Sequence, residues 1–373
     1  MTDPLARYNR QMLLPGFGEA GQRRLIAARV AIVGCGALGC AVAEQLTRAG
    51  VGAGVGAGDG GLTIIDRDVV ESTNLQRQCL FSERDAAEGV PKAEAAARRL
   101  AEVNSTVRVR PVVADLSAAN AQRLIEACDV LVDGTDNFDT RYLLNDLAVK
   151  RGVPFVYAGV VAACGMQMTV RPGVGPCLRC VFPEPPAPGT QPTCDTAGVL
   201  GAAVAIVASV QVAETLKLVL GEHEMLRGEL LEFDLWTGTR REVRVQRDAE
   251  CPACVHHRLD FLEGGRGVRA VWMCGQNSVQ IFPSRDAAAR AVDASDDGED
   301  ELPTIDLPAI AHRLRPHGDV TLTRFMARVA LAGERGDDGG PVLLSVFPDG
   351  RSLIRGLRDP LRARVLYDRY VGA

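Results

Sequence analysis

Two polar clusters near the start of the chain contain residue types suited to binding a nucleotide. Asp66, Arg67 and Asp68 directly follow residues 62–65, an apolar run that predicts a buried parallel strand. Acidic residues at the carboxyl end of such a strand lie where a doubly wound sheet binds its ligand. Residues 74–78 read Asn-Leu-Gln-Arg-Gln, and an asparagine and an arginine this close can reach phosphate oxygens.

A glycine turn lies upstream of these clusters. Residues 30–33 predict a strand, which runs into a turn with the spacing Gly-x-Gly-x-x-Gly and then into a helical pattern. This order places a phosphate against backbone N–H groups at the helix N-terminus. The turn alone is as typical of an NAD-dependent oxidoreductase, whereas together with residues 74–78 it indicates ATP. The turn residues expected to contact the nucleotide are Gly34, Gly36, Ala37 and Gly39.

Binding of ATP sets the roles expected of the remaining charged residues. We expect Asp66 to accept hydrogen bonds from the ribose hydroxyls, and Asn74 and Arg77 to contact phosphate oxygens. Lys92 follows a proline at a predicted helix start, where its ammonium can face the α and β phosphates. Asp136 follows the predicted strand 129–133 and is expected to hold Mg²⁺.

Several of these residues also permit a purely structural interpretation. Asn137 lies beside Asp136 and is counted with the nucleotide site, yet Asp133 or Asp136 alone would also suit a helix N-cap. Arg77 and Lys92, each taken alone, would suit solvated surface charges.

Two Cys-x-x-Cys pairs predict a metal site. Cys177 and Cys180 form the first pair, and Cys251 and Cys254 form the second. Four thiolates complete a tetrahedral Zn²⁺ site and leave no position for water, so the zinc is expected to be structural rather than catalytic. Redox-active thiols are the alternative interpretation.

Composition restricts the class of protein. The formal net charge of −5 argues against nucleic acid as the main partner, and 47% hydrophobic with 24% charged residues is ordinary for a globular protein. The N-terminal residues lack the pattern of a signal peptide, and the apolar run 197–210 is shorter than a membrane span, so we expect a cytoplasmic protein without membrane contact. Five further cysteines are expected to be small buried residues: Cys35, Cys40, Cys79, Cys128 and Cys164.

The pattern along the chain predicts an α/β fold with a doubly wound, Rossmann-like and mainly parallel sheet, extended by antiparallel strands at 163–171, 229–235 and 239–246. The expected domains are residues 1–256, a linker at 257–267 and a small α/β domain at 268–373. In the last, residues 342–347 and 351–354 predict a hairpin, and 357–370 predict a final helix. The glycine-rich segment 50–61 predicts a flexible loop.

These motifs together resemble the ThiF/MoeB family of sulfur-carrier-protein adenylyltransferases, relatives of ubiquitin-activating enzymes. The resemblance covers residues 5–256 and includes residues 7–11 (Arg-Tyr-Asn-Arg-Gln), the glycine turn, residues 66–78, 91–92 and 133–137, and both cysteine pairs. It implies that ATP activates the C-terminal glycine of a small ubiquitin-like carrier, ThiS- or MoaD-like, for thiocarboxylate formation in thiamine or molybdopterin synthesis. A non-catalytic, zinc-stabilised scaffold is a further alternative.

The resemblance also implies partners and two more site residues. Arg10 would reach across a homodimer into the ATP site of the other subunit. Cys194 would take the activated carrier tail covalently, and its position before a helix favours a reactive thiol. A dispensable loop residue is the alternative interpretation of Cys194. The partners expected are a carrier ending in Gly-Gly and a sulfurtransferase or cysteine desulfurase. Cys274 follows a predicted strand, but the residues around it lack the anion cradle of a persulfide-bearing domain.

Overall fold

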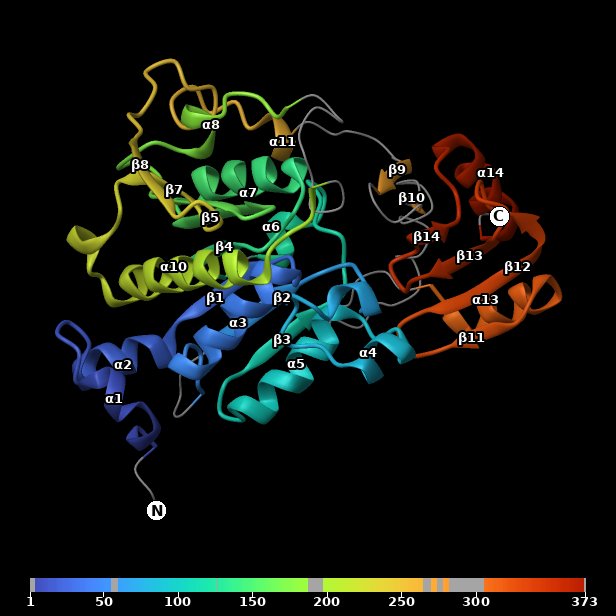
Figure 1. The fold of residues 1–373 in the computed structure, drawn as a ribbon, viewed down its shortest axis with the longest axis horizontal. Helices are drawn as coiled ribbons and strands as arrows, with labels where there is room; N and C mark the ends of the chain where they lie inside the picture. Colours follow the sequence, from blue (N-terminus) through green and yellow to red (C-terminus); the bar gives the residue numbers. More distant parts are fainter. Residues whose placement is uncertain are drawn as a thin grey trace, which may run out of the picture. The chain divides into compact units, whose positions relative to one another are not determined.

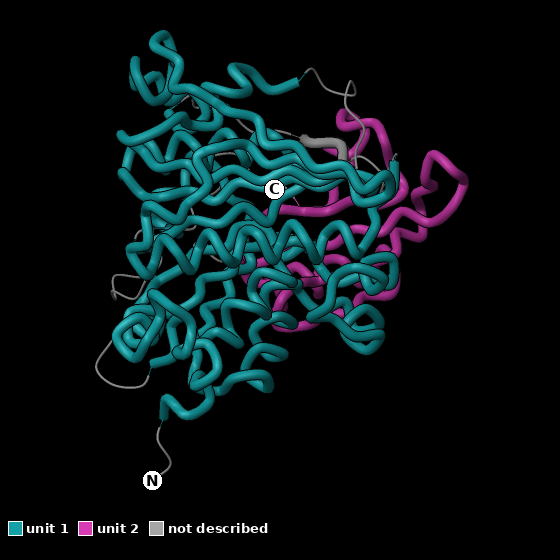
Figure 2. The backbone as a smooth tube through the Cα atoms, turned by 60° about the vertical axis from the view of Figure 1, so that its left-hand side comes forward, with its two compact units in different colours: residues 1–265 teal, residues 266–373 magenta. Residues whose placement is uncertain are grey.

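In the computed structural model, the described residues are 4–54, 60–125, 127–186, 197–263, 270–273, 278–281 and 305–371. The chain divides into two compact units, Met1–Gly265 and Arg266–Ala373 (Figure 2). Each unit has its own sheet and its own hydrophobic core, and each is considered by itself.

The first unit is built on an eight-stranded sheet with the order β3-β2-β1-β4-β5-β6-β7-β8 (Figure 1). Strands β1 to β5 pair in parallel, and β6, β7 and β8 extend the sheet by antiparallel pairing. The predicted mixed, Rossmann-type sheet is therefore confirmed. The strands are β1 (Arg29–Val33), β2 (Gly61–Ile65), β3 (Val109–Val112), β4 (Val130–Asp133), β5 (Phe155–Val161), β6 (Cys164–Val170), β7 (Glu229–Asp234) and β8 (Thr239–Arg244).

The strand order fixes where a ligand can bind. Strand β1 lies between β2 and β4, so the chain leaves β1 toward β2 and β3 and later returns on the other side to β4. At such a switch point the loops after β1 and β4 diverge and leave a crevice at the carboxyl ends of the strands. The glycine turn follows β1, Asp66 follows β2, and Asp136 follows β4.

Helices cover this sheet and are delimited by local signals. Helix α3 ends at Gly50, which has a φ of 81°, and α7 is capped at its start by the Asn137 side chain and ends at Gly152 with a φ of 68°. The helices of the first unit are α1 (Asn9–Met12), α2 (Gly18–Ala27), α3 (Ala37–Ala49), α4 (Glu83–Glu88), α5 (Lys92–Val103), α6 (Ala121–Leu124), α7 (Phe138–Arg151), α8 (Leu178–Val181), α10 (Gly201–Leu220) and α11 (Asp260–Glu263).

Helix α10 is the one helix, among those described, that has the length and hydropathy of a membrane span. It packs against α3 and β5, and 56% of its most apolar window is buried inside the protein. Its side chains Val204, Val207 and Val212 belong to the same core as Ile32 and Ile64 of the sheet. The helix is therefore part of the hydrophobic core of the first unit.

The glycine-rich segment differs from its prediction. Val51, Gly52 and Ala53 are buried, Ala53 forms a bridge with Val107, and a side chain at Gly52 would meet the backbone of Gly61. The expected flexible loop is wrong for this half of the segment, because the chain is packed between α3 and β2. Residues 55–59 lie outside the described residues.

The second unit contains a six-stranded antiparallel sheet with the order β11-β12-β13-β14-β10-β9. The predicted hairpin is present as β13 and β14, and Gly350 of its turn has a φ of 81°. Its elements are β9 (Ala270–Met273), β10 (Ser278–Ile281), α13 (Leu307–Leu314), β11 (Val320–Leu322), β12 (Ala327–Arg335), β13 (Pro341–Val346), β14 (Ser352–Arg355) and α14 (Pro360–Tyr370). Cys274 lies outside the described residues.

Candidate active site

The glycine turn is held by contacts between backbone segments. Gly34 has a φ of 88°, and a Cβ atom there would lie 2.6 Å from the backbone of Gly134, in the loop after β4. A Cβ at Gly39 would lie 1.9 Å from the carbonyl oxygen of Gly34. Gly36 has more room, since its nearest such neighbour is 3.7 Å away, and Ala37 is the first residue of α3. Glycine at 34, 39 and 134 therefore lets the loops after β1 and β4 touch, with the N-terminus of α3 beside them.

Asp66 is bound to the glycine turn. Its carboxylate accepts hydrogen bonds from the backbone N–H of Cys35, at 2.6 Å, and of Asp68, at 2.7 Å. Burial raises the pKa of Asp66, and the neighbouring Lys92 ammonium and these two N–H groups oppose that rise. The remaining lone pairs of this carboxylate are suited to accept hydroxyl donors, as the predicted role at the ribose requires.

Lys92 is a buried cation surrounded by carboxylates. Its side chain is 8% exposed, and Nζ lies 3.2 Å from Oδ2 of Asp68. Burial alone would lower the pKa of the ammonium, but the charges of Asp68, Asp66 and Asp136 outweigh it and raise the pKa. A backbone contact brings the side chains of Lys92 and Asp68 together. The N–H of Lys92 donates to the carbonyl of Asp68 where the segment after β2 crosses the start of α5. Lys92 is thus a buried cation paired with carboxylates rather than a solvated surface lysine.

The loop 74–78 is shaped by its own side chains. Asn74 is buried, and its Oδ1 accepts the N–H of Glu71 in a short 3₁₀ turn, Ser72–Asn74. Arg77 is half-buried, and its Nη1 donates to the carbonyl of Thr73 at 2.9 Å. Asn74 therefore sets the loop conformation from which Arg77 extends. Their contacts with phosphate stay predictions.

The loop after β4 separates a buried carboxylate from an exposed one. Asp133 is fully buried, lies 3.2 Å from Nε of Arg141 and accepts the N–H and hydroxyl of Thr135. Asp136 is exposed, which suits a carboxylate that binds a cation together with a ligand. The N-cap of α7 is Asn137, not Asp133 or Asp136, since Oδ1 of Asn137 accepts a hydrogen bond from the N–H of Thr140. Asn137 therefore positions the loop beside Asp136.

The N-terminal motif, residues 7–11, anchors the short helix α1 to the first unit and leaves the Arg10 side chain exposed to solvent. The hydroxyl of Tyr8 accepts a hydrogen bond from Asn104 at 2.9 Å, and Gln11 donates to the carbonyl of Ala49 at 2.8 Å. Arg7 also bonds Asn104. Arg10, on the same helix α1, is exposed.

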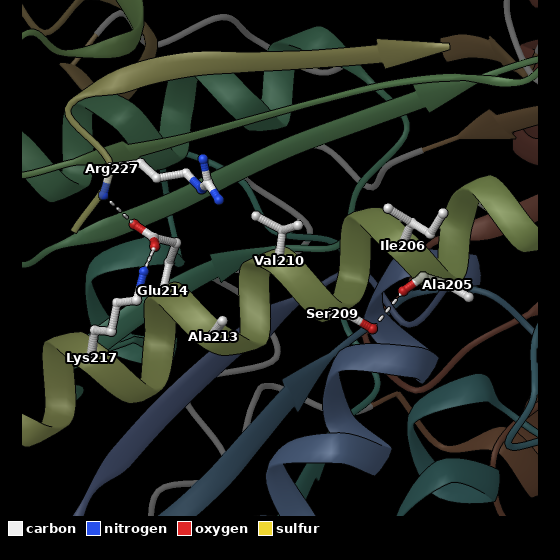
Figure 3. A pocket seen from close by; sticks show the side chains of 8 residues that line it. All are labelled: Ala205, Ile206, Ser209, Val210, Ala213, Glu214, Lys217 and Arg227. Atoms are coloured by element: carbon white, nitrogen blue, oxygen red, sulfur yellow. Dashed lines mark hydrogen bonds and ion pairs between the residues drawn. The ribbon is translucent and has the colours of Figure 1, made fainter. Parts of the chain in front are cut away.

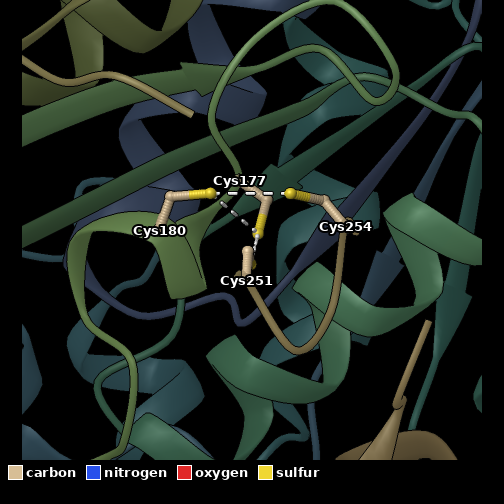
Figure 4. Close-up of side chains that lie close together, drawn as sticks. All are labelled: Cys177, Cys180, Cys251 and Cys254. Carbon is tan, nitrogen blue, oxygen red and sulfur yellow. Dashed lines mark hydrogen bonds between the residues drawn. The ribbon is translucent and has the colours of Figure 1, made fainter. Parts of the chain in front are cut away.

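The four cysteines of the two pairs lie together (Figure 4). Their sulfur atoms are all within 4.8 Å of one another, with 3.5 Å between Cys177 and Cys251 and also between Cys180 and Cys254. Four sulfurs at about 2.3 Å from a central Zn²⁺ would be roughly 3.8 Å apart, so the two separations of 3.5 Å are close to the edge of a zinc tetrahedron. Burial and the three facing sulfurs raise the pKa of the Cys177 thiol, and a divalent cation removes this penalty.

Helix α7 connects the cluster with the loop that contains Asp136. Oδ1 of Asn145 accepts the N–H of Leu178, between the ligands of the first pair, at 2.8 Å. Oδ2 of Asp146 accepts the N–H of Phe261, shortly after the second pair, at 3.0 Å. Arg179, 1% exposed, lies 3.1 Å from Asp260 and joins the two segments again. The metal site therefore braces the C-terminal half of α7, whose first turn follows Asp136.

The remaining cysteines only partly follow their prediction. Cys35 and Cys40 are buried and Cys128 is half-buried, but Cys79 and Cys164 are exposed, so the expectation is wrong for these two and met only in part by Cys128. Cys79 follows the turn formed by the 74–78 loop, and Cys164 begins β6 at the β5–β6 turn, where the chain faces solvent. Cys194 lies outside the described residues.

A groove on the surface of α10 lies apart from these residues (Figure 3). It has a volume of about 320 Å³, and its wall runs from the apolar Ile206 to the polar group of Glu214, Lys217 and Arg227. Glu214 is satisfied inside the protein, by Lys217 at 2.5 Å and by the N–H of Arg227 at 3.0 Å. Its lining includes none of the predicted site residues.

Comparison with known proteins gives a family match that lies within the first unit. Residues 8–253 match the ThiF family. The chain belongs to the ThiF family. The glycine turn, the loop 74–78 and the first cysteine pair lie within the matched residues, as does Cys251 of the second pair, so the family resemblance seen in the sequence is confirmed.

Two relatives of this ThiF protein differ in length. It is 42% identical over 369 residues to the Bacillus subtilis sulfur carrier protein ThiS adenylyltransferase, which covers 98% of this chain and 99% of that protein. It is also 42% identical over 257 residues to a Thermus thermophilus sulfur carrier protein adenylyltransferase, which covers 68% of this chain and 91% of that protein. The second unit is therefore shared with the first relative, while the second relative matches the ThiF unit.

Among solved structures, Escherichia coli MccB with ATP has a similar fold. The match has a TM-score of 0.56 at 22% identity, and it covers 67% of this chain and 74% of MccB. At this identity the likeness concerns the fold alone, and it supports the Rossmann-type arrangement of the first unit.

Sequence reasoning missed two pairings in the ThiF site. The ion pair of Asp68 with Lys92 joins residues 24 positions apart, and only the bridge between Val69 and Pro91 brings them together. Arg141, which holds Asp133, also stacks near the rings of Phe138 and Tyr157. The position of Arg141 one turn into α7 is the sequence signal that could have predicted its pairing with Asp133, since a cation at that position faces the carboxylate at the end of the preceding strand.

Proposed function

We propose that this protein adenylylates the C-terminal glycine carboxylate of a small ubiquitin-like sulfur carrier. One observation carries the proposal: the buried Lys92, Asp66 and the exposed Asp136 gather at the switch point beside the glycine turn, in a chain 42% identical over its length to a ThiS adenylyltransferase. The product would be a carrier acyl-adenylate, ready for thiocarboxylate formation in thiamine or molybdopterin synthesis. The whole-chain relative favours a ThiS-like carrier.

The residues divide the work of the reaction. Backbone N–H groups of the glycine turn and the N-terminus of α3 take phosphate oxygens, and Asp66 takes the ribose hydroxyls. A carboxylate oxygen of the carrier attacks the α-phosphorus, the new O–P bond forms, and the bond to the β-phosphate oxygen breaks to release pyrophosphate. Repulsion between the carrier carboxylate and the triphosphate is reduced by Lys92, Arg77 and Asn74. The same side chains stabilise the negative charge that develops on the leaving pyrophosphate.

Two metals belong to the proposal. Mg²⁺ would neutralise the triphosphate while held by Asp136, whose exposed carboxylate faces the Lys92 and Arg67 cations. Zn²⁺ would be held by the four cysteines and would supply stability only, because the four thiolates complete its coordination. A reducing cytoplasm would keep these thiols available.

A homodimer completes the proposed site. Arg10 is exposed on a helix whose Tyr8 and Gln11 are fixed, so it is placed to contact something other than its own core. It would reach the triphosphate bound to the partner subunit. Cys194 would then accept the activated carrier, and a sulfurtransferase or cysteine desulfurase would supply the sulfur.

An oxidoreductase and an inactive scaffold are not favoured. The glycine turn is shared with dehydrogenases, but the ThiF family match over residues 8–253 includes the loop 74–78 and the first cysteine pair. An inactive scaffold has no use for a lysine held charged inside three carboxylates, an arrangement that costs desolvation energy.

ATP–pyrophosphate exchange tests the proposal. Purified ThiS-like and MoaD-like carriers are supplied separately, each with its C-terminal Gly-Gly and with the last glycine removed. Exchange that needs one intact carrier, and that is lost in Asp136→Ala but kept in Asp139→Ala, is the expected result. Asp139 is an exposed carboxylate three residues further on, in the first turn of α7, so it controls for charge alone. Exchange with neither carrier would refute the proposal.

A further inference from the structure

Strands β4 and β5 stop pairing just before the loop that contains Asp136. Their parallel pairing ends at Val132 and Val156. Asp133, the last residue of β4, pairs with Val33 of β1 but, within the described range 127–186, with no residue of β5. The side of β4 that faces β5 therefore needs another hydrogen-bond donor at this point, because a buried carbonyl left without a donor costs stability.

A side chain of α10 supplies this donor. Gln211 is fully buried, and its Nε2 donates to the carbonyl oxygen of Asp133 at 2.8 Å and to that of Val156 at 3.2 Å. Helix α10 packs against both β4 and β5, so the amide joins the two strands where their own pairing has ended. Its Oε1 has no hydrogen-bond partner among the described residues, which is costly for a buried oxygen. The contribution of this amide therefore lies in its two N–H bonds.

The start of the loop that contains Asp136 is held by three elements. Strand β1 holds it because the N–H of Gly134 donates to the carbonyl of the last residue of β1 at 2.7 Å. Helix α7 holds it through the ion pair of Arg141 with the Asp133 carboxylate. Helix α10 holds it through Gln211 and the carbonyl of the same Asp133. Because only residues 134 and 135 separate Asp133 from Asp136, a shift of this carbonyl moves the exposed carboxylate as well.

We infer that Gln211 is a positioning residue, which sets the place of the Asp136 carboxylate relative to the triphosphate by holding the end of β4. The inference deepens the proposed function and rests on it. In the described part of the chain, the Gln211 side chain bonds to the carbonyls of Asp133 and Val156, and not to the glycine turn or Lys92. Loss of Gln211 should therefore weaken the binding of a divalent cation at Asp136 more than the binding of the nucleotide.

Cation binding tests the inference without relying on turnover. Mn²⁺ serves as a paramagnetic probe in place of Mg²⁺, and its affinity for the protein saturated with a non-hydrolysable ATP analogue is measured from the resonance signal of free Mn²⁺. Gln211→Met keeps an unbranched side chain and removes both donors, so we expect Mn²⁺ to bind about tenfold more weakly. Affinity for the analogue without a divalent cation should stay within about twofold of wild type. Unchanged Mn²⁺ affinity in this variant would overturn the inference.

Thr215→Val is the matched control. Thr215 is also fully buried on α10, and its hydroxyl donates to the backbone carbonyl of Gln211 at 2.8 Å, within the helix. This variant should lose stability and keep its Mn²⁺ affinity. An equal loss of Mn²⁺ affinity would show that any damage to α10 reaches the site, and a specific role for Gln211 would be wrong.

A shorter amide covers the case in which Gln211→Met does not fold. The side chain of Gln211→Asn lacks one methylene and cannot reach both carbonyls, so it should also weaken Mn²⁺ binding. Wild-type Mn²⁺ affinity in Gln211→Asn would refute the positioning role.

A double-mutant cycle with Asp136→Ala locates the effect. Once the Asp136 carboxylate is absent, Gln211→Met should cause no further loss of Mn²⁺ affinity. A further loss of about tenfold would place the effect elsewhere and contradict the inference. The inference and the proposed function fail separately. Absence of carrier-dependent exchange in the unaltered protein would refute the proposed function, whereas exchange together with wild-type Mn²⁺ affinity in Gln211→Met would overturn the positioning role alone.

Discussion

The contrast between two glycines of the same turn gives a sharp prediction. In Gly39→Ala the new Cβ would lie 1.9 Å from the carbonyl oxygen of Gly34, whereas real Cβ contacts are not shorter than 3.0 Å. The backbone segments must therefore separate by about 1 Å, and strain of this kind costs about 1–3 kcal/mol of stability. Because the moved segment is the phosphate turn itself, we also expect ATP affinity to fall by at least about tenfold.

Gly36→Ala is the matched control. The nearest atom to its new Cβ is 3.7 Å away, and Gly36 has φ −78° and ψ −151°, which alanine also adopts. Its free energy of unfolding should stay within about 0.5 kcal/mol of wild type. ATP affinity should still fall, because the methyl group stands where the backbone approaches the pyrophosphate.

Denaturant unfolding and ATP titration of both variants provide the assay. The expected result is that Gly39→Ala loses stability and affinity, while Gly36→Ala loses affinity alone. Equal stability of the two variants would refute the reasoning, because it would mean that the first turn of α3 does not approach the carbonyl of Gly34 as closely as the structure places it.

Four further predictions follow from the site and the metal cluster. Lys92→Met should lower pyrophosphate exchange by about 100-fold or more, since it leaves carboxylates facing one another without their buried cation; near-normal exchange would contradict that placement. Cys251→Ser should lose bound zinc and melt at lower temperature, as measured by metal analysis and calorimetry, while Cys164→Ser, at an exposed position, should keep both. Burial raises the pKa of Asp146 to about 6, so ionisation of this carboxyl disfavours the folded state. As pH rises from about 4 to 7, the free energy of unfolding of the wild type should fall by up to about 3 kcal/mol relative to that of Asp146→Asn. A difference in stability between the two proteins that is constant with pH would refute this. A chain ending at Gly265 should retain exchange, because the Thermus thermophilus relative aligns over 257 residues, close to the length of the first unit. Complete loss in a folded truncation would show that the second unit acts in catalysis.

The repeated βα units could be predicted from the sequence because each has a local signal. Strand β1 is a short apolar run before a glycine turn, and α3 and α7 end at glycines that adopt positive φ. The cysteine spacing likewise depends only on neighbours in the chain. Local geometry therefore fixed the order of the elements and the existence of the metal cluster.

Pairings that depend on tertiary contacts could not be predicted in this way. Asp68 meets Lys92 only because a bridge crosses two loops, and Asp133 meets Arg141 only because α7 packs over the end of β4. The burial of residues 51–53 was missed for the same reason, since a glycine-rich stretch carries no apolar pattern that shows it will be packed. Such residues acquire their roles from neighbours distant in the sequence.

The sulfur cluster has a consequence for the topology of the chain. Its two halves, at Cys177 and Cys180 and at Cys251 and Cys254, are separated by 74 positions, and the stretch between them contains α10, β7 and β8. A bound metal would turn this stretch into a closed ring. A protease that cuts the ring once would then leave both pieces joined through the metal, so the nicked protein should keep its fold until a chelator opens the second connection.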